Sequence, residues 1–183
     1  MKALPFSGVY SASAALFATA VLAWRAEPVP PGPATTRAAF VPVALVTGAA
    51  VALLYIFLFN QSATTFGQLA ELRREAKAGG KRAPRLAEVK YGGGNGAVLA
   101  ADRLVGNYLE QLVPFLLSLF GHALFVSASR AAAFSWAWIF FRSYYGLAFG
   151  RPFPALLAST IPAYCCVWWM AGPAIHAAAA LEM

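Results

Sequence analysis

The chain has 183 residues, of which 60% are hydrophobic and 11% are charged, and its formal net charge is +7. Soluble domains carry about 25% charged residues. With a mean hydropathy of +0.62, this composition excludes an ordinary soluble domain and indicates an integral membrane protein with several spans.

Five apolar segments follow one another along the chain, at residues 8–24, 39–59, 98–121, 131–149 and 154–175. Each is close to the roughly 20 residues that a spanning helix needs. Helices also satisfy every backbone polar group within the bilayer. We therefore predict an all-α integral membrane protein with five spans. The first segment is rich in Ala and Ser and could instead be a cleaved signal peptide that starts at Lys2; we treat it as a span.

Residues 60–97 form the only long polar stretch, and a proline-rich connector occupies 26–38. We predict that 66–78 continue the second span as a helix and that 79–96 form a loop. The stretch contains seven basic residues: Arg73, Arg74, Lys77, Lys81, Arg82, Arg85 and Lys90. The positive-inside rule places this basic loop on the cytoplasmic side, or the matrix or stromal side of an organelle. No aromatic residues alternate with the charges, so we do not expect nucleic-acid binding.

Residues 103–117 (RLVGNYLEQLVPFLL) place polar side chains at the head of an apolar segment. Arg103, Asn107, Glu110 and Pro114 are spaced i, i+4, i+7 and i+11. At about 100° per residue they fall within roughly 60° of one another on one helix face. Ionisable groups at membrane depth are costly and must face a partner or a wet cavity. This face is therefore a candidate binding site.

The cysteines, the histidines and Tyr164 do not indicate a reactive site. Cys165 and Cys166 are adjacent and are interpreted as small apolar packing residues. His122 and His176 lie near span ends, where we expect solvation at the interface rather than metal binding. Tyr164 is grouped with the lipid-facing aromatic residues of the spans. We expect no metal site.

The segment ADRLVGNYLEQLVPFL resembles the MAPEG family, the membrane-associated proteins in eicosanoid and glutathione metabolism, and is most similar to its microsomal glutathione transferases. The matching residues are Arg103, Asn107, Glu110 and the pair Pro114–Phe115. The segment FRSYYGLAFG (141–150) resembles the end of the family's third helix. ATTFGQLAELRREAK (63–77) resembles the polar half of its first helix. The likeness covers roughly residues 39–175.

This resemblance implies a left-handed four-helix bundle at about 39–175 that assembles as a homotrimer. Residues 1–38 would add an N-terminal transmembrane helix and its connector, and 39–183 would form the MAPEG-like domain. Glutathione would bind between neighbouring protomers near the cytosolic face of the membrane. The endoplasmic reticulum is the expected location, with an organellar inner membrane or a thylakoid as the alternative.

The resemblance also implies roles for individual residues. Arg103, Arg142 and either Arg73 or Arg74 would bind the carboxylates of glutathione. Glu110 would bind its ammonium group, and Asn107 its peptide portion. A thiol needs a nearby cation or hydrogen-bond donor to ionise at neutral pH; Tyr145 and Arg151 are the candidates for that catalytic role.

Two positions differ from the family pattern. Phe149 stands where the family has a second tyrosine, and residues 152–160 at the start of the last helix contain no arginine. Two functions therefore stay open. The first is an enzyme that conjugates glutathione to lipophilic electrophiles or reduces lipid hydroperoxides. The second is a catalytically silent accessory subunit, held by unlike subunits of a respiratory or photosynthetic membrane complex.

Overall fold

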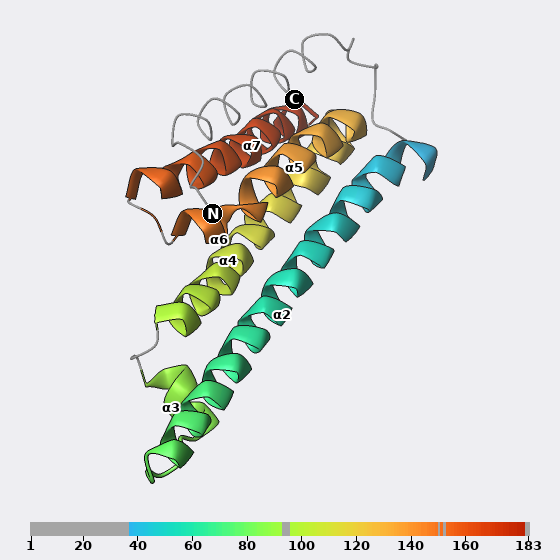
Figure 1. Ribbon diagram of the computed structural model, residues 1–183. Helices are drawn as coiled ribbons and strands as arrows, with labels where there is room; N and C mark the ends of the chain where they lie inside the picture. Colours follow the sequence, from blue (N-terminus) through green and yellow to red (C-terminus); the bar gives the residue numbers. More distant parts are fainter. Residues whose placement is uncertain (1–36, 93–95, 150, 152, 182–183) are drawn as a thin grey trace.

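The computed structural model describes residues 37–92, 96–149, 151 and 153–181. Every regular element in these ranges is helical: η1 (Arg37–Phe40), α2 (Val41–Ala78), α3 (Leu86–Tyr91), α4 (Gly96–Phe125), α5 (Ala128–Ser143), α6 (Tyr145–Phe149) and α7 (Phe153–Ala179). Figure 1 shows α2 running past the ends of the other helices, with α3 folded against its far part. The expected all-α fold is confirmed for the described residues.

Helix α2 is one continuous helix of 38 residues, which corresponds to a length of roughly 57 Å. Its first half is apolar and its second half is polar, so the predicted helical continuation through 66–78 is confirmed. Gln61 marks the change, and its side-chain amide donates a 2.7 Å hydrogen bond to Asp102 on α4. This bond fixes the relative position of the two helices where the apolar stretch ends.

The prediction that 79–96 form a loop is wrong for Leu86–Tyr91, which form α3. The Glu88 carboxylate accepts hydrogen bonds from the Arg82 side chain and from the Arg85 backbone N–H, and these bonds hold the pKa of Glu88 below its ordinary value. Buried Val89 packs against Leu69 of α2 and Val98 of α4. These contacts between helices and the Glu88 hydrogen bonds that cap the start of α3 stabilise a helix, although the surrounding glycines favour a loop.

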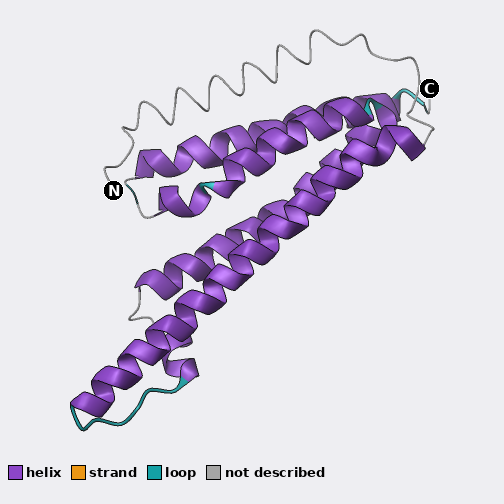
Figure 2. Cartoon of the chain, turned by 45° about the vertical axis from the view of Figure 1, so that its right-hand side comes forward, coloured by secondary structure: helices purple, strands orange, loops and turns teal. Residues whose placement is uncertain are grey.

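Helix α4 lies in the middle of the bundle and contacts α2, α5 and α7; Figure 2 shows it running alongside α2. Its core is aromatic. The Phe115 and Trp138 rings stack with centroids 3.9 Å apart, and the Tyr108 ring lies 5.4 Å from Trp138. The buried Tyr108 hydroxyl donates a 2.8 Å hydrogen bond to the Ala50 carbonyl. Three helices are thereby joined by aromatic side chains from α4 and α5.

The segment 131–149 is not the single span that the sequence predicted, because α5 ends at Ser143 and α6 begins at Tyr145. Two carbonyl groups at the end of α5 accept hydrogen bonds from side chains. The Ser143 hydroxyl donates to the Phe140 carbonyl at 2.7 Å, and the Ser159 hydroxyl of α7 donates to the Phe141 carbonyl at 2.6 Å. Side chains thus replace the helical donors that the break removes.

The expected number of five spans is not confirmed. By length and composition, three helices in the described ranges are suited to cross a membrane: Val41–Ala78, Gly96–Phe125 and Pro154–Ala179. Helix α5 has only 16 residues, and the segment 8–24 lies outside the described residues. These long apolar helices nonetheless support the predicted integral membrane protein.

The position of His122 corrects another expectation. It is buried, with 1% of its surface exposed, and is not solvated at an interface. Its Nδ1 lies 3.1 Å from the Met170 carbonyl oxygen of α7. Because a carbonyl only accepts, Nδ1 carries the proton. His122 therefore joins α4 to α7 within the bundle.

The aromatic stack predicts a difference between two tryptophans. Trp138→Ala removes a fully buried ring, and we expect it to lower the free energy of unfolding by about 3–5 kcal/mol through the cavity left behind. Trp168→Ala, at a side chain that is 72% exposed, should change it little. Unfolding of both variants in detergent by denaturant titration measures the difference; equal losses would contradict the stacked core.

Candidate functional site

Arg142 is the central residue of the site. It lies in the last turn of α5 with 1% of its surface exposed. Its Nη2 donates a 3.0 Å hydrogen bond to the Asn107 backbone carbonyl and a second, short one to the Asn107 side-chain oxygen. The guanidinium carbon lies 5.0 Å from the centre of the Tyr145 ring and 5.9 Å from that of Trp138. Two predicted site residues, Asn107 and Tyr145, thus contact a third.

Two further nitrogens of Arg142, Nε with one N–H and Nη1 with two, find no acceptor among the residues that the structure describes. Buried polar groups are nearly always hydrogen-bonded, and a buried charge is costly unless it is paired. The described part of a single chain therefore leaves a buried cation with unused donors. This is the strongest indication of a binding site in the molecule.

Arg103 and Glu110 flank this cation on the surface of α4. Both side chains are exposed, and they do not form an ion pair with each other. The Glu110 carboxylate is close enough to act electrostatically on Arg142 and Tyr145. The backbone carbonyl of Glu110 also lacks its helical donor, because residue 114 is a proline with no N–H. The site therefore offers positive and negative groups side by side.

Local packing explains why α6 lies next to α4. Gly146 sits against Leu104, and a Cβ atom at residue 146 would lie 3.2 Å from a Leu104 methyl carbon. A glycine here permits the close approach that places Tyr145 over Arg142. The Tyr144 hydroxyl donates a 2.8 Å hydrogen bond to the Ala158 carbonyl of α7, which fixes the break between α5 and α6.

The sequence analysis missed Gln111 and Tyr164. The Gln111 amide donates a 3.4 Å hydrogen bond to the Tyr164 hydroxyl of α7. Tyr164 is therefore not merely a lipid-facing aromatic residue. No pattern in the sequence around Tyr164 indicated a role in the site. Gln111 could have been found, because it directly follows the predicted site residue Glu110 on the same helix.

Within the described ranges, no hydrogen bond or ion pair joins this cluster to Arg73, Arg74 or Arg151. Arg73 is 12 residues beyond Gln61 on α2, which is about 18 Å along the helix axis, and its Nε donates to the Pro84 carbonyl at 3.3 Å. Arg74 is exposed beside it. Arg151 is exposed in the turn before α7. Their proposed roles in binding and catalysis stay predictions.

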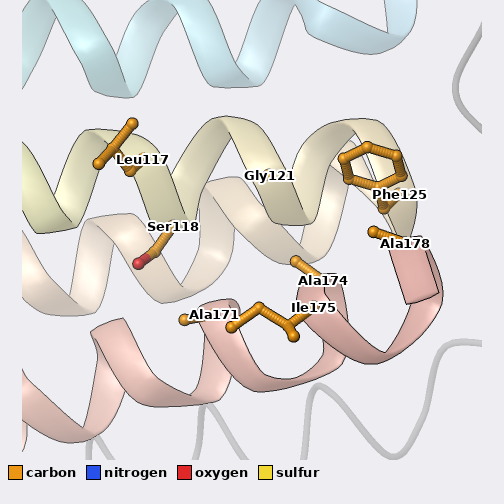
Figure 3. Close-up of a pocket in the computed structure, with 8 residues that line it drawn as sticks. All are labelled: Leu117, Ser118, Gly121, Phe125, Ala171, Ala174, Ile175 and Ala178. Atoms are coloured by element: carbon orange, nitrogen blue, oxygen red, sulfur yellow. The ribbon is translucent and has the colours of Figure 1, made fainter.

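A shallow groove between α4 and α7 lies away from the charged residues and has a volume of about 260 Å³. Figure 3 shows Ala171, Ile175 and Ala174 along it opposite Gly121, with Phe125 and Ala178 at one end. Its lining contains no charged side chain, so it does not suit an ionic ligand. The buried cation and the charges beside it remain the candidate site.

These features define a helical membrane protein with a buried arginine whose surroundings carry both charge signs. The model of the MAPEG family matches residues 43–175. The chain therefore belongs to the MAPEG family, and the family resemblance seen in the sequence is confirmed. Neither the curated proteins nor the solved structures contain a match to this chain.

The Asn107–Arg142 contact predicts a loss of stability when Asn107 is truncated. Asn107→Ala removes the side-chain acceptor of a buried cation, and hydrogen bonds to charged groups contribute about 1.5–3 kcal/mol. Asn60→Ala, at an exposed position on α2, is the matched control. Denaturant unfolding in detergent compares the two; a loss no larger than that of the control would show that Asn107 does not hold Arg142.

Proposed function

We propose that this MAPEG protein binds glutathione at the Arg142 cluster and uses it against lipophilic electrophiles or lipid hydroperoxides that arrive from the bilayer. The observation that carries the proposal is the buried Arg142, two of whose nitrogens, Nε and Nη1, have no acceptor among the described residues. A carboxylate is the acceptor that best complements a guanidinium. A ligand carboxylate would therefore supply the partner that this cation lacks within the described chain.

The other charges of glutathione fit the rest of the cluster. The tripeptide has two carboxylates, one ammonium group and one thiol. Arg103 can bind the second carboxylate, Glu110 can bind the ammonium, and the backbone carbonyl of Glu110, to which Pro114 cannot donate, can add an acceptor. A ligand without a carboxylate for Arg103 and an ammonium for Glu110 would leave both side chains unpaired at membrane depth, which is costly.

The exposed charges of α4 support self-association of this chain at the same site. Arg103 and Glu110 are exposed on a helix suited to span the membrane, and charged side chains in such helices usually face other protein or water. We propose that copies of this chain, as a homotrimer, meet along this face and enclose the ligand. Arg73 and Arg74 would then contribute from the cytosolic extension of a neighbouring copy.

Binding should depend on the negative charge of Glu110. In full-length protein in lipid nanodiscs, we expect Glu110→Gln to weaken glutathione binding by about tenfold or more, because the ammonium group loses its counter-charge. Glu75→Gln, on the exposed extension of α2, should bind as the unchanged protein does. Isothermal titration calorimetry measures both. Binding that is absent in the unchanged protein, or equal in both variants, would refute the proposed site.

Catalysis is tested separately, by glutathione-dependent turnover of several lipophilic electrophiles and of a lipid hydroperoxide. Turnover that falls in Glu110→Gln supports the enzyme. Binding without turnover, together with stoichiometric co-purification of unlike subunits, would favour the silent accessory subunit instead.

A further inference from the structure

The nitrogens of Arg142 that lack an acceptor are also closed to the surroundings. Nε and Nη1 are both buried, and 1% of the surface of the residue is exposed. A carboxylate oxygen must come within about 2.9 Å of such a nitrogen to accept its hydrogen bond. An anion therefore cannot reach these donors in the conformation that the structure shows. A side chain that covers the guanidinium has to move first.

Two of the side chains around the guanidinium are held in place. Asn107 accepts both hydrogen bonds of Nη2, through its backbone and side-chain oxygens. Trp138 is fully buried and stacks on Phe115 of α4 with ring centroids 3.9 Å apart. Moving either one would break a hydrogen bond to a buried cation or open the aromatic core. Neither is suited to let a ligand in.

Tyr145 covers the cation from a different position. It is the first residue of α6, a helix of five residues that follows the break after Ser143. Its ring centre lies 5.0 Å from the guanidinium carbon of Arg142, and it packs at 6.1 Å on Phe149 of the same short helix. The Tyr145 hydroxyl forms no hydrogen bond with the part of the chain that the structure describes. The ring can therefore turn away without breaking a hydrogen bond.

We propose that the Tyr145 ring is a gate over Arg142, closed in this structure, and that it must turn away before a ligand carboxylate can bind to Nε and Nη1. The part of this inference that concerns glutathione rests on the proposed function. In the closed state the ring compensates the buried cation, because the face of an aromatic ring attracts a guanidinium within about 6 Å. The apparent affinity for a ligand is then the intrinsic affinity multiplied by the fraction of molecules whose gate is open.

The gate requires the ring of Tyr145 and not its hydroxyl. The catalytic role that the family resemblance implied for the same residue requires the hydroxyl, which would lie near the thiol. Tyr145→Phe keeps the ring and removes the hydroxyl, whereas Tyr145→Ala removes both. The two variants therefore distinguish a gate from a donor that activates the thiol.

The gate is tested without a ligand, by modifying arginines with phenylglyoxal in full-length protein in lipid nanodiscs and following each site by peptide mass spectrometry. In the unchanged protein we expect buried Arg142 to react slowly and exposed Arg103 to react fast. Tyr145→Ala should raise the rate at Arg142 by about tenfold or more, because minor open states are typically about 0.1–10% populated. Tyr145→Phe should keep Arg142 slow. Tyr55→Ala, at an exposed ring of α2, is the matched control and should also keep it slow.

Arg130 shows whether the fold survives, because it is 8% exposed and lies on the same helix as Arg142. If Tyr145→Ala also speeds the reaction of Arg130, Tyr145→Leu, which keeps more apolar packing, decides instead. A slow rate at Arg142 in the variant that keeps Arg130 slow would overturn the gate. Fast reaction of Arg142 in the unchanged protein or in Tyr145→Phe would also overturn it. Fast reaction of Arg130 in both smaller variants would make Tyr145 a core residue and not a gate.

Calorimetry with glutathione in the same nanodiscs tests the link to the proposed function. We expect Tyr145→Ala to bind more tightly than Tyr145→Phe by about the factor by which the modification rate rises, since the same closed fraction limits both. Failure of the unchanged protein to bind glutathione would refute the proposed function, while the phenylglyoxal result still decides whether the gate exists. Binding that is lost in Tyr145→Ala although Arg142 has become reactive would make the ring part of the ligand site and overturn the gate.

Discussion

The contact between Arg142 and Asn107 joins the parts of the molecule on which the candidate site depends. A guanidinium inside an apolar bundle is costly unless its donors are used, and Asn107 takes up one nitrogen of the group through two oxygens. That contact brings the end of α5 to the middle of α4. Tyr145 then covers the cation, and Arg103 and Glu110 lie on the open side. Charge burial therefore determines where the other site residues are placed.

The sequence predicted the part of this arrangement that helical periodicity determines. Arg103, Asn107 and Glu110 share one face of α4 because they are spaced by whole turns. Periodicity could not reveal which of them would be covered, because Asn107 is covered only by a side chain from another helix. The same limit hid Gln111 and Tyr164, which meet across 53 positions of the sequence. The family match adds membership but does not identify a ligand.

The wrong predictions about the fold have a common physical origin. The segment around Ser143 looks like a continuous apolar run in the sequence, and the break there is stabilised by hydrogen bonds with α7 that the local sequence does not reveal. His122 was expected at an interface because it lies near the end of a span, yet the Met170 carbonyl holds it inside. Helix α3 forms where glycines suggested a loop, since Val89 finds apolar partners on two other helices. In each case tertiary contacts outweighed the local pattern.

The break between α5 and α6 affects how the site can move. Tyr144 at the break donates a hydrogen bond to α7, and Ser159 of α7 donates one back to the end of α5. The segment that carries Tyr145 is therefore anchored at its start. Displacing the ring from Arg142 requires either rotation of one side chain or a shift of α7 with it. Movement of the segment that carries Tyr145 is thus coupled to the last helix, so a substitution on α7 near Ala158 or Ser159 can change how Arg142 is covered without touching a charged residue.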